Sequence, residues 1–113
     1  MQYLLIICHD ASFTPSEALI RDIRAWINDM DLRNVRVHGN PLRPPSDAVT
    51  VRVRGEQLRV ANGPFANSKE KMCAYELINC STHEEAIEVA SKHPMAKAAT
   101  IEMRPVWAEL ADQ

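Results

Sequence analysis

The sequence predicts an α+β domain in which an antiparallel sheet is covered on one face by two helices. Strand-like runs rich in β-branched residues alternate with two segments of helical periodicity. Their order is strand, helix, strand, hairpin, strand, helix, strand, which is typical of this architecture. The length of 113 residues matches one domain with one core, so we expect residues 1–113 to form a single domain.

The first strand and the first helix have clear sequence signals. Residues 3–8 form the apolar run YLLIIC, which ends at a polar cluster and predicts a central strand. The pattern TPSE follows, with Thr14 as the expected N-cap and Pro15 at the first helical position. Apolar residues then recur at steps of three and four as far as Met30, so this helix is expected to cover one sheet face.

The middle of the chain predicts short strands separated by loops. A second strand is expected over residues 35–38, and the glycine- and proline-rich residues 39–45 are expected to form a loop. The runs VTVRVR and QLRV, joined at Gly55, predict a hairpin with one exposed face on each arm. A second loop over residues 62–67 leads to a further strand over residues 72–80.

The last elements complete the predicted fold. The pattern STHE at residues 81–84 predicts the start of a second helix, which Pro94 is expected to close near His93. Residues 99–103 predict a last strand that Pro105 stops. Two helices cover only one sheet face, so we expect a ferredoxin-like sheet with an inserted hairpin, whose other face is covered by a second copy in a homodimer.

Composition narrows the functional classes. Apolar residues make up 46% and charged residues 25%, and the net charge of -2 offers no basic footprint for nucleic acid or an anionic membrane. The longest apolar run is far below the roughly 20 residues that cross a bilayer, so a cytoplasmic location is expected. Cys8, Cys73 and Cys80 lie in strand-like runs without C-x-x-C spacing, which predicts buried, inert thiols and no metal or cofactor.

Several blocks of the sequence resemble one family. They are MQYLL at the start, the loop ending Pro44-Pro45, the hairpin VTVRVRGEQLRV, the run NGPFANSKE, the strand with Tyr75, the helix centre EEAIEVA and the run IEMRPV. Together they resemble the YCII-related proteins, in the branch named for its DGPF loop, and the resemblance spans nearly the whole chain. It implies a dimeric α+β barrel with a cleft at this loop.

The chain departs from the family pattern at the loop. Asn62 stands where the family has aspartate, Asn67 where a glutamate is common, and Cys73-Ala74 replaces a frequent glycine pair. An amide holds no negative charge and takes no proton, so an acid/base role of the family's loop carboxylate is not available here.

Candidate ligand-binding residues lie in and after this loop. Its glycine and proline predict a rigid turn that presents Asn62 to a cavity with Phe65 beneath it, the alternative being a plain connection whose Phe65 fills the core. Lys69 is a candidate for an anionic ligand because it is near the loop. Arg104 shares a strand face with Glu102, so it is a candidate either for ligand binding or for an ion pair.

Three of the four histidines are candidates for the site. His9 follows the first strand, His38 ends the second, and His93 precedes a proline. An imidazole beside Asp10 or Asp47 is suited to general base catalysis, and the wider YCII group resembles enzymes that use a histidine and aspartate dyad. We therefore take His38 and His9 as candidate catalytic bases and His93 as a candidate ligand-binding residue, the alternative being ordinary hydrogen-bonded histidines.

Two functions fit these features. The first is binding of a small organic ligand near the NGPF loop with lyase- or isomerase-like proton transfer, in which Lys69 or Arg104 holds an anionic group. The second is a non-catalytic ligand- or protein-binding regulatory module, since the chain resembles DGPF-loop proteins that accompany extracytoplasmic-function sigma factors. Fold alone does not choose between them.

Overall fold

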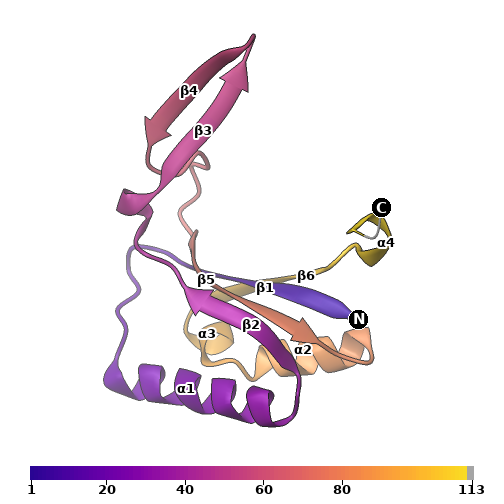
Figure 1. The fold of residues 1–113 in the computed structure, drawn as a ribbon. Helices are drawn as coiled ribbons and strands as arrows, with labels where there is room; N and C mark the ends of the chain where they lie inside the picture. The colour runs from indigo at the N-terminus through magenta and orange to yellow at the C-terminus, as the bar shows by residue number, and fades with distance from the viewer. Residues whose placement is uncertain (112–113) are drawn as a thin grey trace.

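The computed structural model describes residues 1–111 and contains a helix-covered sheet and a separate hairpin (Figure 1). The elements in chain order are β1 (Gln2–His9), α1 (Glu17–Leu32), β2 (Arg36–Pro41), the 3-10 turn η1 (Pro45–Asp47), β3 (Val49–Arg54), β4 (Gln57–Asn62), β5 (Lys71–Asn79), α2 (His83–Ser91), α3 (Pro94–Ala98), β6 (Thr100–Pro105) and α4 (Ala108–Ala111). No helix within residues 1–111 is long and apolar enough to span a membrane.

The four-stranded sheet has the order β2-β5-β1-β6, and each neighbouring pair is antiparallel. Two strand–helix–strand units interlock in this order, which confirms the predicted ferredoxin-like arrangement. The hairpin β3–β4 forms a second, two-stranded sheet inserted between β2 and β5, also as predicted.

Side-chain alternation in β1 separates the two faces of the sheet. Tyr3, Leu5 and Ile7 are buried toward the helices, where Trp26 and Met30 of α1 are among the residues that pack over the sheet. The intervening residues of β1 point to the opposite face, which α1, α2 and α3 leave uncovered (Figure 1). We call this second face the open face.

Both main helices begin later than the sequence patterns predicted. Thr14 is not the N-cap of α1; Ser16 is, and its hydroxyl oxygen accepts a hydrogen bond from the Leu19 N–H at 3.1 Å. In α2 the cap is Thr82, whose hydroxyl accepts from the Glu85 N–H at 3.1 Å. In the α1 segment Leu19 stands three residues after Ser16, so the capping-box pattern indicated Thr14 instead. In the α2 segment both Ser81 and Thr82 have a glutamate three residues later, so the pattern does not distinguish between them.

The loop predicted to start at Gly39 was wrong, because β2 continues to Pro41. β2 is an edge strand, so the missing N–H of a proline is tolerated there. The predicted role of Pro94 was also wrong: α2 ends at Ser91, and Pro94 instead opens α3 at its first position.

A buried ion pair fixes β2 against β5. Glu76 is 5% exposed, and its Oε2 lies 2.7 Å from Nε of Arg36, which also donates to the Gly39 carbonyl at 2.9 Å. A Cβ at Gly39 would overlap the Glu76 carboxylate, so any larger residue there would have to displace this side chain from its ion pair. Burial raises the pKa of Glu76, and the hydrogen bond and charge of Arg36 oppose that shift.

The three cysteines are free within the described chain. Burial is the main cause that raises the pKa of each thiol, and for Cys8 the nearby Glu70 and Glu102 carboxylates raise it further. We expect less than half of the total thiol to react with iodoacetamide at neutral pH over a time that fully labels the urea-unfolded chain. Mass spectrometry of each cysteine measures this, and rapid native labelling of two of them would contradict it.

Candidate functional site

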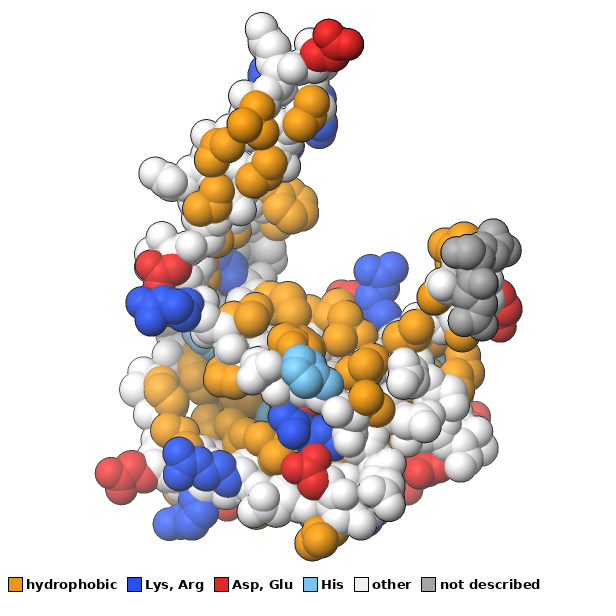
Figure 2. Space-filling model, viewed as in Figure 1, with side chains coloured by type: hydrophobic (Ala, Val, Ile, Leu, Met, Phe, Trp, Pro, Cys, Tyr) orange, Lys and Arg blue, Asp and Glu red, His pale blue; other side chains and the backbone are white. Residues whose placement is uncertain are grey.

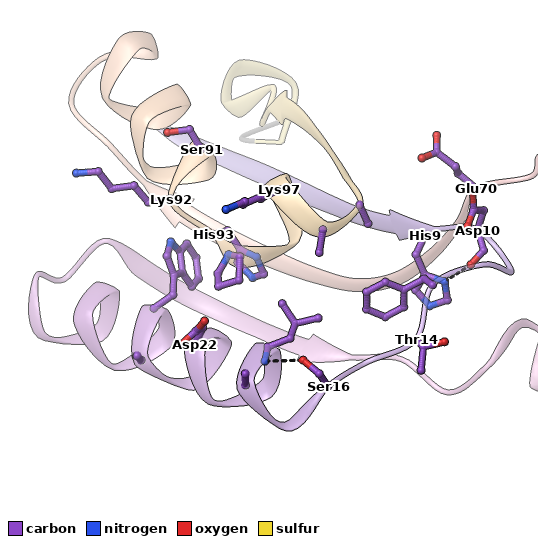
Figure 3. Close-up of a pocket in the computed structure, with 18 of the residues that line it drawn as sticks. His9, Asp10, Thr14, Ser16, Asp22, Glu70, Ser91, Lys92, His93 and Lys97 are labelled. Atoms are coloured by element: carbon purple, nitrogen blue, oxygen red, sulfur yellow. Dashed lines mark hydrogen bonds between the residues drawn. The ribbon is translucent and has the colours of Figure 1, made fainter.

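A groove of about 1150 Å³ runs between α1 and α3, from the β1–α1 loop to the end of α2 (Figure 3). Its walls come from the end of β1 with the loop that follows, from α1, from Glu70 just before β5, and from the α2–α3 region. The polar residues that line it include His9, Asp10, Ser12, Thr14, Ser16, Asp22, Glu70, Ser91, Lys92, His93 and Lys97. We call it the α1–α3 groove.

His9 has a defined tautomer at one end of the groove. Its Nδ1 lies 2.9 Å from the backbone carbonyl oxygen of Asp10. Because a carbonyl oxygen only accepts, Nδ1 must carry the hydrogen, and in the neutral ring Nε2 keeps its lone pair. The ring stacks on Phe13 with centroids 4.6 Å apart, which restrains its orientation.

The carboxylate of Asp10 serves the loop rather than His9. Asp10 Oδ1 accepts hydrogen bonds from the hydroxyl of Ser12 at 2.5 Å and from the Ser12 N–H at 2.9 Å. These bonds, the hydroxyl first, lower the pKa of Asp10. The structure therefore joins His9 and Asp10 through the backbone carbonyl, and the side-chain carboxylate holds the turn that leads into α1.

His93 has the complementary tautomer. It is 2% exposed and caps α3, where its Nδ1 accepts the Met95 N–H at 3.0 Å, so the hydrogen of the neutral ring lies on Nε2. Burial lowers the pKa of His93 to about 4, so the ring is neutral near pH 7. The ring meets Trp26 edge-on with centroids 4.6 Å apart, and the Trp26 indole donates to the Val89 carbonyl at 3.1 Å.

Charged groups complete the groove. The Glu70 carboxylate accepts from the Thr100 hydroxyl at 2.5 Å, and Lys92 pairs with Glu88 at 3.0 Å. Asp22 points from α1 toward the groove, and Lys97 projects from α3 on the opposite side (Figure 3). Within residues 1–111, no three His, Cys, Asp or Glu side chains form a group that could hold a metal ion.

His38 lies on the open face, outside the α1–α3 groove. Its Nδ1 is 3.0 Å from the Tyr75 hydroxyl, and the Asn40 amide nitrogen donates to the same hydroxyl at 3.3 Å. Asp47 pairs instead with Arg43 at 2.8 Å. The structure thus gives His38 a tyrosine and an asparagine as neighbours.

The loop residues also lie outside the groove. Asn62 ends β4, and Phe65 is 76% exposed, with its ring centroid 6.0 Å from the Arg52 guanidinium. The expected packing of Phe65 beneath the loop is therefore wrong, and so is the alternative in which Phe65 fills the core. Lys69 is exposed in the segment before β5, and Arg104 stands opposite Leu4 on the open face.

Of the seven candidate residues, the groove brings together His9 and His93. Sequence reasoning missed Phe13 and Lys97 as groove residues. Phe13 sits four residues after His9 in a loop, where spacing does not predict stacking. Lys97 lies in a short helix that the sequence patterns did not indicate.

Comparisons with known proteins give one consistent result. Residues 1–109 match the family model described as the YCII-related domain. An uncharacterised protein of Rhizobium meliloti (strain 1021) is 34% identical over an alignment 114 residues long, which covers 94% of this chain and 92% of that protein. The family match covers the four-stranded sheet, the inserted hairpin and the helices α1, α2 and α3.

Proposed function

The chain belongs to the YCII-related family, and we propose that it binds a small polar organic molecule in the α1–α3 groove and takes a proton from it with His9. The observation that carries this proposal is the hydrogen bond from His9 Nδ1 to the Asp10 carbonyl, which leaves a basic Nε2 on a half-buried ring. An imidazole in this state is suited to general base catalysis near neutral pH.

The other groove residues suit the charge that such a step creates. When His9 Nε2 removes a proton from an acidic C–H or O–H bond, negative charge develops on an oxygen of the ligand. The Nε2–H of His93 and the ammonium of Lys97 are donors that would stabilise it. Return of the proton from His9 to a different atom completes an isomerisation, whereas departure of a leaving group completes an elimination.

In this proposal Lys97 takes the anion-binding role that the sequence suggested for Lys69 or Arg104, because Lys97 lines the groove and the other two do not. Asp22 and Glu70 add negative charge to the groove. A ligand with both an oxygen acceptor and a polar or cationic group therefore fits the lining better than a simple anion.

The test measures proton exchange in D₂O with a panel of small oxo acids and amino acids. Exchange is detected as the loss of their C–H signals in proton NMR. We expect His9→Asn to slow exchange by about 100-fold or more, since a positioned general base contributes about 10²–10⁴. Asparagine keeps a donor for the Asp10 carbonyl, so the loop should remain folded. The matched control, His38→Asn, should retain exchange; loss only in that variant would move the base to the open face.

A second candidate function is a non-catalytic regulatory module that binds a small ligand or a protein. The exposed Phe65 and the neutral Asn62 in the family loop favour it. Sigma-factor association is one form of this function. Ligands that raise the melting temperature without any proton exchange in wild type would support the module over the enzyme.

We also propose that the protein is a homodimer in the cytoplasm, formed through the open face. Leu4 and Leu77 are paired neighbours there and are only half-buried, and apolar surface continues along this side of the sheet (Figure 2). His38 and Arg104 flank these leucines across the sheet, so both would lie at the interface.

Sedimentation at micromolar concentration is expected to give twice the mass of one chain. Replacement of Leu77 by Asp should shift the equilibrium to the single chain, because it places a charge in the apolar centre of the interface. A wild-type protein that sediments only as a single chain would contradict the dimer and leave the groove proposal intact.

A further inference from the structure

The hairpin of residues 49–62, here called the arm, projects from the open side of the molecule (Figure 1). Within residues 1–111, β3 and β4 pack mainly on each other and not on the four-stranded sheet or its helices. A lone two-stranded hairpin is only marginally stable in water, so an arm of this kind is expected to gain stability from a partner surface.

The arm has one apolar and one basic face. Cross-strand register places Val51 opposite Val60 and Val53 opposite Leu58. Residues on this apolar face are 57–68% exposed; they are Val49, Val51, Val53, Leu58 and Val60. Figure 2 shows hydrophobic side chains gathered along this face of the arm. Such a surface on an otherwise polar projection marks a protein interaction site.

The basic face favours a second copy of the chain as the partner. Arg52 stands opposite Arg59, and with Arg54 and Glu56 they give the arm a net charge of +2. The rest of the chain has ten basic and fourteen acidic residues, a net charge of −4. Two copies thus attract each other when the arm of one approaches the body of the other.

A matching surface lies at the other end of the same side. Trp107 is 69% and Leu110 is 58% exposed in the segment that follows β6, where Glu109 is the single charged residue of positions 106–111. This segment and the arm both rise on the open side of the sheet, at opposite ends, so they do not meet within one chain (Figure 1).

We propose that the arm of each protomer docks, by its apolar face, on the C-terminal segment around Trp107 of a second copy. The apolar face of the arm meets the exposed side chains of Trp107 and Leu110. The arginines on its other face point away from this contact and attract the acidic partner only at long range. A two-fold axis makes this contact twice. The inference rests on the proposed homodimer and assigns the surface that stabilises it.

The experiment compares the full chain with two double variants. Val51→Thr with Val60→Thr removes apolar surface from one face, and Arg52→Thr with Arg59→Thr alters the neighbouring cross-strand pair on the other face; threonine suits a strand in both. Sedimentation should give a dimer dissociation constant raised at least about tenfold by the valine variant and less than about threefold by the arginine variant.

Tryptophan fluorescence tests the docking site. Trp26 is 5% exposed and should emit at constant wavelength, whereas Trp107 should shift to longer wavelength when wild type is diluted to single chains. Hydrogen exchange of arm amides in wild type, which needs no variant, should slow as protein concentration rises.

Each other result overturns a defined part of the proposal. Equal dissociation constants for the two double variants would overturn the arm contact and leave the dimer. A weakened valine variant with Trp107 emission unchanged on dilution would overturn the C-terminal segment as the docking site and indicate the partner's arm. A single-chain wild type at all concentrations would overturn both the dimer and the arm contact, without touching the role of His9.

Discussion

Acidification from pH 6.5 to pH 4 is expected to cost about 3 kcal/mol of folding stability through His93 alone. The folded-state pKa of His93, about 4, lies below the ordinary value of 6.5 that the unfolded chain recovers. The unfolded chain therefore binds the proton first as pH falls. The stability contribution is complete above pH 6.5 and is lost progressively down to about pH 4.

The measurement is the free energy of unfolding by urea at pH 7, 5.5 and 4, for wild type and for His93→Asn. Asparagine can still accept the Met95 N–H at the start of α3 but does not titrate. Carboxylates with lowered pKa values, such as Asp10, destabilise both proteins on acidification and cancel in the difference. Parallel pH profiles for the two proteins would show that His93 titrates normally in the folded state.

Arg36→Met is expected to destabilise the protein by about 3–5 kcal/mol at pH 7, because it leaves the buried Glu76 carboxylate without its ion-pair partner. Adding Glu76→Leu to that variant should restore most of the loss, since the unpaired charge is then gone. Arg43→Met is the matched control, because the Arg43–Asp47 pair is exposed and should contribute less than about 1 kcal/mol.

The cost of Arg36→Met should shrink on acidification. Burial raises the pKa of Glu76 in the folded state above its value in the unfolded chain. Protonation of this carboxyl therefore stabilises the folded state at pH values below the unfolded-state pKa, and that stabilisation is lost as pH rises through the folded-state pKa. The hydrogen bond and charge of Arg36 lower the pKa of Glu76, so this pKa is higher in the Arg36→Met variant. Urea unfolding at pH 4 and pH 7 measures the difference, and an equal cost at both values would contradict a buried, unpaired carboxylate.

Gly39 explains why the sequence did not predict the full length of β2. The run Gly39-Asn40-Pro41 has strong loop signals, but Gly39 lies in a strand where the Glu76 carboxylate of the neighbouring strand occupies the space of a Cβ. The partner residue is 37 positions away in sequence, so no local pattern reports it. The order of strands and helices along the chain was predictable because alternation and helical periodicity are local patterns.

The candidate site was less predictable for the same reason. His9 and His93 line the same groove although 84 positions separate them in sequence. The tautomer of His9 depends on the Asp10 carbonyl, and that of His93 on the Met95 N–H. The NGPF loop has the strongest local signals, yet Phe65 is exposed beside the arm. The glycine and proline of the loop predicted a rigid turn, but they did not predict which part of the molecule the loop lies against.

The most direct test of the central claim is the nitrogen chemistry of His9, read from ¹⁵N NMR of histidine-labelled protein, with His9→Asn used to assign the signals. We predict that at pH 7.5 the ¹⁵N chemical shift of His9 Nδ1 is that of a protonated ring nitrogen and the shift of Nε2 is that of an unprotonated one. A compound that exchanges its proton should perturb the His9 Nε2 resonance and leave the His38 resonances in place. A hydrogen on Nε2 of His9, with Nδ1 unprotonated, would contradict the account, because the nitrogen assigned as the base would then be a donor.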